Sequence, residues 1–265
     1  MQHSALLNVM IAAARKAARA LKRDFGELEK LQVSLKGPGN FVSAADRRAE
    51  ETLYTELVKA RPGYSFLGEE GGRREGTDKT NTWIVDPLDG TTNFLHGLPQ
   101  FAISIALERE DTVIAGLIYN PANEEMFIAE RGKGAFLNEQ RIRVAARKRL
   151  ADAVVACGLP HRGHGDLGIS RKETGAMQEH VAGLRRFGAA ALDLAWVAAG
   201  RLDGYWERDL KPWDMAAGLI IVREAGGFVS DCDGKDGMFG NGHIVAGNET
   251  IQKELLAVLK AASTS

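Results

Sequence analysis

Two aspartates in the segment WIVDPLDGTTNF, residues 83–94, have the spacing of a site for a charged ligand. Asp86 and Asp89 stand three positions apart, and the bend at Pro87 lets both carboxylates face the same site. The same bend can present the backbone carbonyl of Leu88. Carboxylate oxygens without His or Cys partners suit hard divalent cations, above all magnesium. The segment therefore predicts a magnesium site.

Two further acidic positions extend this set. Glu69, in the pair Glu69-Glu70, lies at the end of the predicted strand YSFLGEE, and Asp214 opens a predicted helix after Pro212. Each acid lies where a strand or loop ends, and a strand end can aim a side chain into a cleft. Because magnesium keeps several waters and takes only a few carboxylates, the four acids can serve two or three ions.

The residues after the second aspartate suit phosphate. Gly90, Thr91 and Thr92 begin a predicted helix, where exposed amides attract phosphate and glycine permits close approach. Metal ions on one side of a phosphate and backbone donors on the other would polarise the phosphoryl oxygens, activate a water and neutralise the leaving alkoxide. The expected reaction is hydrolysis of a phosphate monoester.

Each acidic cluster also has an ordinary structural explanation when it is taken alone. Glu69-Glu70 is typical of a solvated turn, and Asp214 is typical of a helix N-cap. The Asp-Pro-x-Asp-Gly sequence is typical of a turn. The joint appearance of all three, each at the end of an apolar strand or loop, favours the metal-phosphate site.

Apolar periodicity predicts the elements of a first lobe. Apolar residues at 6, 7, 10, 11, 14, 18 and 21 predict an amphipathic helix packed on the core, although an organelle-targeting peptide is the alternative because no acid precedes Asp24. A loop at 36–43 leads to Ser43, which can cap a helix that ends before Pro62. The predicted sheet is antiparallel and is interrupted by a polar loop at 75–80. Its strands are 64–70 and 82–87, then 101–110 and 111–121 paired as a β-hairpin, and further strands with a Gly-containing turn within 124–138.

The second lobe alternates strands and helices. A basic run at 141–149 marks the boundary, so the lobes are 1–145 and 146–265 of a single domain. Predicted strands are 152–159, 185–188, 202–207, 228–231 and 242–248. Predicted helices are 166–184, 189–200, 213–227 and one that starts near 249. This alternation predicts the α/β class for the second lobe, beside an α+β first lobe.

The composition is that of a globular protein, with 45% of 265 residues hydrophobic and 26% charged. The net charge of −1 gives no broad electrostatic case for binding nucleic acid or a membrane, and no apolar run reaches the ~18 residues of a membrane span. Cys157 and Cys232 fit no CxxC spacing, which argues against structural zinc and suits a reducing compartment, the cytoplasm. His161 and His164 lack convincing metal-ligand partners and indicate a surface loop.

Three motifs, in this order and separation, resemble the inositol monophosphatase family. They are GEE, WIVDPLDGTTNF and PWDMAAGLIIVREAGG, and the resemblance covers essentially the whole chain. It implies a layered αβαβα sandwich, a homodimer, a small-molecule phosphate ester as substrate, two or three Mg²⁺ ions and inhibition by lithium. The reaction implied is conversion of inositol monophosphate to inositol and phosphate by attack of a metal-activated water.

The resemblance also implies residue roles. The metal ligands are the side chains of Glu69, Asp86, Asp89 and Asp214 and the carbonyl of Leu88. The catalytic residues are Glu69, Asp86, Asp89, Asp214, Thr91 and Asp46, the last two orienting the attacking water. The substrate is bound by Asp89, Gly90, Thr91, Gly188, Ala189, Ala190, Glu207 and Asp214.

Other functions remain open at this point. Ala189 stands where relatives often carry Ser or Thr, which leaves the preferred polyol undecided. The same chemistry on fructose 1,6-bisphosphate, histidinol phosphate or a 3'-phosphoadenosine nucleotide is the alternative. Some bacterial relatives act through RNA or a transcription complex, and the basic run is the feature of this chain that leaves such binding possible.

Overall fold

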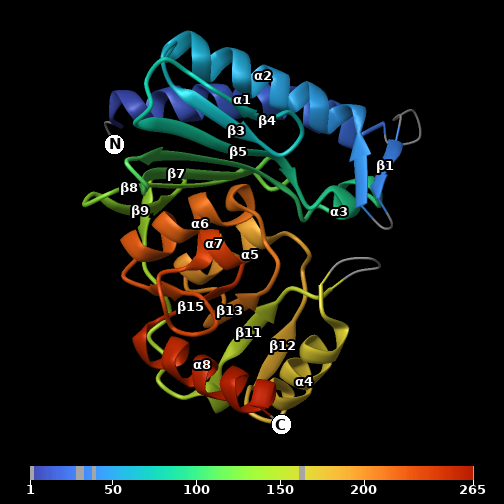
Figure 1. Cartoon of the computed structure of the whole chain (residues 1–265), viewed down its shortest axis with the longest axis vertical. Helices are drawn as coiled ribbons and strands as arrows, with labels where there is room; N and C mark the ends of the chain where they lie inside the picture. Colours follow the sequence, from blue (N-terminus) through green and yellow to red (C-terminus); the bar gives the residue numbers. More distant parts are fainter. Residues whose placement is uncertain (1–2, 28–32, 38–39, 161–164, 265) are drawn as a thin grey trace.

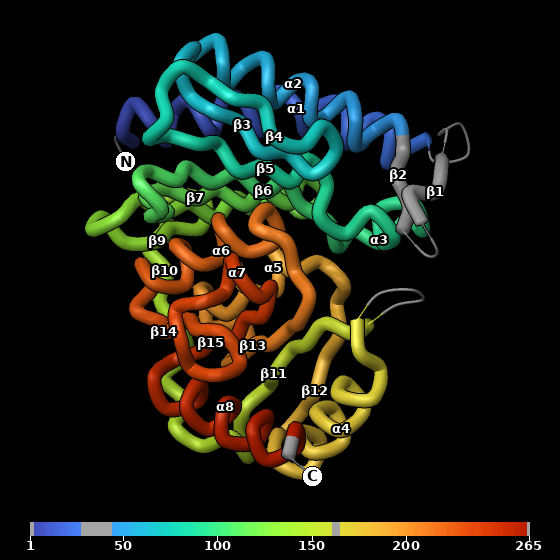
Figure 2. The backbone as a smooth tube through the Cα atoms, viewed as in Figure 1, coloured from blue at the N-terminus to red at the C-terminus, as the bar shows by residue number. Residues whose placement is uncertain are grey.

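The helices and strands of the chain stack in alternating layers. A computed structural model describes residues 3–27, 33–37, 40–160 and 165–264, so the histidines at 161 and 164 lie outside the described residues (Figure 2). Figure 1 shows two helices, an eight-stranded sheet, a middle layer of helices, a five-stranded sheet and two further helices. This αβαβα order confirms the predicted fold class. Within the described parts of the chain, no helix is long and apolar enough to cross a membrane.

The first layer is formed by two helices, α1 (Ala5–Phe25) and α2 (Ala44–Ala60). The apolar stripe of α1 is buried, as predicted for a helix packed on the core, and Ser4 caps it by accepting from Leu7 N at 3.1 Å. The helix α2 ends before Pro62, also as predicted.

The loop predicted at 36–43 is wrong. The strands β1 (Val33–Gly37) and β2 (Asn40–Ser43) pair antiparallel there, and residues 38–39 between them lie outside the described residues. Gly, Pro and Asn at the connection are typical of a hairpin turn, and they obscured the short strands that flank it.

The larger sheet has the strand order β10-β9-β8-β7-β6-β5-β3-β4. Its strands are β3 (Ser65–Gly68), β4 (Gly72–Arg74), β5 (Asn81–Asp89), β6 (Ala102–Arg109), β7 (Thr112–Asn120), β8 (Glu125–Glu130), β9 (Gly134–Leu137) and β10 (Gln140–Ile142). The hairpin of β6 and β7 confirms its prediction. The sheet is not wholly antiparallel as predicted, because β3 and β5 run parallel. The unpredicted strand β4 and the loop at 75–80 supply the return connection that a parallel pair needs.

The smaller sheet is mixed and has the order β12-β11-β13-β15-β14. Its strands are β11 (Val154–Cys157), β12 (Gly183–Arg185), β13 (Gly204–Glu207), β14 (Phe228–Ser230) and β15 (Ile244–Gly247). The strand predicted at 185–188 lies earlier, because the backbone of Gly188 has a φ of +80°, which extended strand does not use. A single turn of 3₁₀ helix, η2 (Leu150–Asp152), and a short helix, α7 (Met238–Asn241), were not predicted.

The middle layer joins the two sheets. It contains α5 (Ala190–Ala198) and α6 (Pro212–Glu224), with α7 beside them, while α4 (Leu167–Gln178) and α8 (Glu249–Thr264) cover the outer face of the smaller sheet (Figure 1). Small residues let the middle helices pack closely. A Cβ atom added to Gly218 would lie 2.5 Å from Leu194 Cδ1, so α5 and α6 can touch only with glycine there. The hydroxyl of Ser104 on β6 donates to Trp213 O at 3.1 Å, which holds the first turn of α6 against the larger sheet.

Candidate active site

The carboxyl-terminal end of β5 presents two aspartates from the protein interior. The predicted strand ends at residue 87, but β5 continues to Asp89 and its register with β6 shifts between Asp86 and Asp89. That irregularity replaces the regular alternation of side chains, which would send residues three apart to opposite faces. Asp86 and Asp89 are only 2% and 9% exposed.

Each aspartate is oriented by a backbone amide. Asp86 Oδ1 accepts from the N–H of Leu88 at 2.9 Å. Asp89 Oδ2 accepts from the N–H of Ala191 at 2.8 Å, at the start of α5. The larger sheet and the middle helix layer are therefore joined through Asp89, and each carboxylate keeps a second oxygen that these bonds do not use.

The residues after β5 form the short helix α3 (Thr91–Leu95). Gly90 precedes it with a φ of +88°, and a Cβ atom there would lie 2.8 Å from Gln100 O, so glycine is required. The Thr91 hydroxyl lies 3.0 Å from Asp46 Oδ1 and 3.1 Å from Leu88 O, and its one hydrogen can serve either acceptor. The structure thus brings together the Thr91–Asp46 pair on which the resemblance depends.

The remaining acids come from two other elements. Glu69 lies in the turn after β3, and its N–H donates to Val85 O of β5 at 3.2 Å. Asp214 lies in the first turn of α6, where its Oδ2 accepts from Lys211 N at 2.7 Å. The N-cap residue is therefore Lys211 rather than Asp214, which stands at the third position of α6 and bonds back to the N-cap amide with one oxygen. Its second oxygen remains available for another role.

The negative charges of these acids raise the pKa values of their neighbours. Burial raises the pKa of Asp86 well above its ordinary value, and the negative charges of Glu69, Asp89 and Asp214 raise it further. Burial and then the charge of Asp214 also raise the pKa of Asp89. Burial is again the main cause for Asp214, whose pKa rises to about 7. Four carboxylates from three elements thus repel one another in a poorly solvated place.

The donor set fits magnesium by its chemistry. The available groups are hard carboxylate oxygens, and a divalent cation among them would turn mutual repulsion into attraction. Among the residues that the structure describes, no three His, Cys, Asp or Glu side chains already surround one point as metal ligands. The oxygens bonded to Leu88, Ala191 and Lys211 explain part of this, because they are directed at backbone amides. The ligand set stays a prediction.

A cavity of about 610 Å³ lies beside these acids. Of the predicted site residues, Glu69, Glu207 and Asp214 line it, while Asp86 and Asp89 are buried and are not among its lining residues. Gly158 provides the room that Glu207 occupies, since a Cβ atom on Gly158 would lie 1.7 Å from Glu207 Cδ. The hydroxyl of Tyr205 donates to Glu207 Oε2 from behind.

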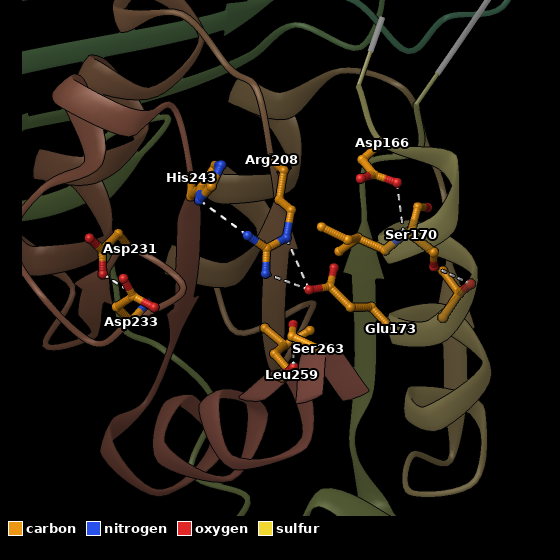
Figure 3. A network of polar contacts seen from close by, with 11 residues as sticks. Asp166, Ser170, Glu173, Arg208, Asp231, Asp233, His243, Leu259 and Ser263 are labelled. Carbon is orange, nitrogen blue, oxygen red and sulfur yellow. Dashed lines mark hydrogen bonds and ion pairs between the residues drawn. The ribbon is translucent and has the colours of Figure 1, made fainter. Parts of the chain in front are cut away.

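A charged network supports another wall of the cavity. Figure 3 shows Arg208 between Glu173 and His243. Arg208 Nε donates to Glu173 Oε1 at 3.0 Å, and Nη1 lies 3.2 Å from His243 Nδ1. The network fixes the chain after β13 against α4 and against the segment before β15. It was not predicted from the sequence, because its three members are far apart along the chain.

The segment before α5 lies close to α3. Gly188, Ala189 and Ala190, predicted to line the polyol pocket, are followed at once by the amide that binds Asp89. Asn93 Nδ2 lies 2.8 Å from Phe187 O and 3.3 Å from Gly188 O. Ala189 and Ala190 are buried and absent from the cavity lining, so their predicted contact with substrate stays a prediction.

A family model described as the inositol monophosphatase family matches residues 2–264. The chain belongs to the inositol monophosphatase family. This membership confirms the resemblance stated from the three motifs, and it confirms the enzyme class, since the family is one of phosphatases.

The matches to individual relatives extend over almost the full length of the chain. An inositol-1-monophosphatase from Mesorhizobium japonicum is 60% identical over 260 residues, covering 98% of each protein. A Nus factor SuhB from Pseudomonas aeruginosa is 43% identical over 263 residues, covering 96% of each. The crystal structure of extragenic suppressor protein suhB from Bartonella henselae has a TM-score of 0.95 at 56% identity, and the match covers 97% of this chain and 99% of that one.

One polar residue of this inositol monophosphatase family member was missed inside its own signature. Asn93 lies within the motif at 83–94, yet its side chain was given no role. The structure shows Asn93 to be 6% exposed and bonded to carbonyls of a segment 94 residues away. The available sign was an asparagine directly before the apolar pair Phe94-Leu95, because a polar side chain that is buried beside apolar residues needs hydrogen-bond partners.

Proposed function

We propose that this inositol monophosphatase family member hydrolyses inositol monophosphate to inositol and phosphate, with magnesium as cofactor. The observation that carries the proposal is the convergence of buried Asp86 and Asp89 with Asp214, which lines the cavity, close enough for their negative charges to repel one another. Clustering of charge at this cost in stability is a feature of functional sites. Glu69 and the carbonyl of Leu88 complete the proposed ligand set.

The chain's own groups have distinct roles in the proposed reaction. Bound magnesium would supply positive charge to the phosphoryl group and to the leaving oxygen. Thr91, when its hydroxyl donates to Asp46, keeps its oxygen lone pairs free to accept from the attacking water and orient it. The amides of Gly90 and Thr91 would hold the phosphate, which glycine allows to approach closely.

The polyol part of the substrate would lie in the cavity. Glu207 lines it with one carboxylate edge engaged by Tyr205, so the other oxygen can accept from substrate hydroxyls. Burial raises the pKa of Glu207 to about 7, which lets this carboxyl either accept or donate near neutral pH. A cavity of about 610 Å³ accommodates a single polyol ring and also several other phosphate esters.

A panel of esters tests the reaction and the substrate together. The panel contains inositol 1-phosphate, fructose 1,6-bisphosphate, histidinol phosphate and 3'-phosphoadenosine 5'-phosphate, with phosphate release as the readout. We expect magnesium-dependent release that is fastest with inositol 1-phosphate. Much slower turnover of inositol 1-phosphate than of another ester would refute the substrate assignment and leave the chemistry standing.

The variant Asp89→Asn tests the chemistry itself. Asparagine keeps an oxygen that can accept from Ala191 N, so the local structure should persist while the charge is lost. We expect phosphate release to fall by about 100-fold or more at saturating magnesium, with an unchanged circular dichroism spectrum. Wild-type activity in this variant would contradict the ligand assignment.

The remaining properties are proposed from the family resemblance. They are two or three Mg²⁺ ions at work, inhibition by lithium, a homodimer and a cytoplasmic location. The location is supported by Cys157 and Cys232, which are both buried and unpaired. Sedimentation of the purified chain tests the dimer, and titration of activity with lithium tests the inhibition.

A second candidate function is binding to a transcription complex. It is favoured by the Nus factor SuhB at 43% identity and by the exposed residues Arg141, Arg143 and Lys148 of the basic run. A pull-down with wild-type and Asp89→Asn protein separates the two functions. Partner capture that survives the loss of hydrolysis supports a separate role, and no capture by either protein argues against it.

A further inference from the structure

A carboxylate that the motifs do not include lies on the buried face of α2. Glu50 is 3% exposed, and its neighbours on that face, Ala49, Leu53 and Leu57, are fully buried apolar residues. Glutamate is rarely found at such a position unless its charge has partners. The partners of Glu50 therefore indicate what it does.

Both oxygens of Glu50 are bonded to one backbone turn. The N–H of Glu70 donates to Oε2 at 2.8 Å, and the N–H of Gly71 donates to Oε1 at 2.7 Å. Hydrogen bonds from amides to an ionised carboxylate are stronger than bonds between neutral groups. The carboxylate of Glu50 thus holds two consecutive peptide units against α2.

This turn carries the predicted metal ligand Glu69. It is the short connection of the hairpin between β3 and β4, in which Gly68 pairs with Gly72. The N–H of Glu69 itself donates to Val85 O of β5. The turn is therefore held from two sides. The strand β5 accepts from the amide of Glu69, and Glu50 of α2 accepts from the next two amides.

The composition of the turn is fitted to the carboxylate. A Cβ atom on Gly68 would lie 2.4 Å from Glu50 Oε2, and one on Gly71 would lie 2.8 Å from Oε1. Neither distance leaves room for a methyl group. Glu50 can therefore approach this turn so closely only because residues 68 and 71 are glycines.

The helix α2 also reaches the other half of the site. Asp46 stands four residues before Glu50, so both side chains project from the same face. Asp46 accepts from Thr91 at 3.0 Å. Two carboxylates of α2 therefore reach the site: Asp46 contacts Thr91, and Glu50 contacts the turn that carries Glu69.

We propose that Glu50 is a positioning residue that fixes the turn presenting Glu69 and thereby sets the affinity of the site for a divalent cation. The inference rests on the proposed function, because it takes Glu69 to be a ligand. Glu50 itself touches neither substrate nor metal. Loss of its bonds leaves the ligand present but free to move, which weakens cation binding.

The test compares full-length Glu50→Gln with a matched variant, Glu224→Gln. Glu224 also accepts from two amides of a glycine-containing turn, those of Gly132 and Gly134 at 2.8 and 2.7 Å. Calorimetric titration with Mn²⁺ alone measures cation affinity without any ester, and amide exchange at residues 70 and 71 reports the turn directly. We expect Glu50→Gln to raise the Kd for Mn²⁺ about tenfold and to speed exchange at both amides.

The control separates positioning from general stability. Glu224→Gln should bind Mn²⁺ within about twofold of the wild type, even where both variants lose similar stability. Equal Kd values for the two variants would overturn the proposal, as would a wild-type chain that binds no Mn²⁺. If Glu50→Gln does not fold, Glu50→Asp, which keeps the charge but shortens the reach, carries the same comparison. A wild-type chain that binds Mn²⁺ but hydrolyses no ester refutes the proposed function alone.

Discussion

Glu207 is the last residue of β13 in the smaller sheet, and its side chain faces the cavity. Its carboxylate lines the cavity and also accepts from the hydroxyl of Tyr205 on the same strand. Burial raises the pKa of Glu207 to about 7, while the hydrogen bond from Tyr205 and the charge of Arg186 oppose that rise. The folded chain therefore binds a proton at Glu207 more tightly than the unfolded chain does.

The variant Glu207→Gln should change how stability depends on pH. The folded pKa is raised from 4.5, so the wild-type contribution is fully present below pH 4.5 and is lost as the pH rises through about 7. Glutamine has no such loss. We expect the free energy of unfolding of the variant, relative to wild type, to be about 2 kcal/mol higher at pH 8 than at pH 4.5.

Urea unfolding in the presence of EDTA measures this difference at the two pH values. EDTA is needed because a bound cation would dominate the titration of every nearby acid. The same variant should also hydrolyse the ester more slowly if Glu207 contacts substrate hydroxyls. A constant stability difference between pH 4.5 and pH 8 would show that folding does not raise the pKa of Glu207.

The candidate functional residues inside the motifs could be predicted from the sequence, but the residues that hold them in place could not. Asp86 and Asp89 were recognised from their spacing around a proline, which needs no knowledge of the fold. Glu50 and Asn93 gain their roles from partners that come from other elements, and no short motif records such contacts. The ligand roles themselves remain predictions until a cation is measured.

Long elements with a regular pattern of apolar residues were predicted well. The helix α1 and the hairpin of β6 and β7 lie where the apolar pattern placed them. The strands β1, β2 and β4 were missed, because three to five residues contain too little pattern to separate strand from loop. The parallel pairing of β3 with β5 depends on tertiary contacts and has no local signature.

The contact between α3 and the segment before α5 depends on Asn93. Its Nδ2 lies 2.8 Å from Gln100 O and from Phe187 O. Replacement by alanine leaves those partly buried carbonyls without their donor. We expect Asn93→Ala to lower the free energy of unfolding by about 1–3 kcal/mol and to lower kcat/KM about tenfold, since the pocket segment loses its anchor.

A matched asparagine separates these two effects. Asn248 Nδ2 also bridges two carbonyls, those of Ala145 and Arg147 at 2.8 and 2.7 Å, and it does so outside the cavity lining. Asn248→Ala should lose similar stability and keep kcat/KM within about twofold. Equal losses of kcat/KM in both variants would mean that Asn93 acts only on stability.

The largest hydrophobic core among the described residues contains side chains from both sheets. One cluster of buried side chains includes Ile84 and Ala106 from the larger sheet, Ala156 and Ile244 from the smaller sheet, and most of α5 and α6. Helices that are apolar on every side are typical of such a central position. On this ground we propose that residues 1–265 fold as one domain, of which the lobes 1–145 and 146–265 are halves.

The spacing between α6 and the larger sheet is set by Gly116 of β7. A Cβ atom at Gly116 would lie 2.5 Å from Ile220 Cγ2 and 2.7 Å from Ala217 O. The backbone oxygen cannot turn aside as a side chain can, so Gly116→Ala must displace α6. We expect the free energy of unfolding to fall by about 1–3 kcal/mol, as measured with urea. Because Asp214 lies in the first turn of α6, the Kd for Mn²⁺ should rise as well.

Gly175 of α4 is the control for this substitution. It is exposed in the middle of its helix, and a Cβ atom there meets nothing within 4 Å. Gly175→Ala should therefore raise the free energy of unfolding by about 0.5–1 kcal/mol, through helix propensity alone, and leave the Kd for Mn²⁺ unchanged. Gly116→Ala protein that is destabilised but binds Mn²⁺ like the wild type would show that α6 can move away from the larger sheet without disturbing the site. That outcome would contradict the role of α6 as the element that holds Asp214 against the end of β5.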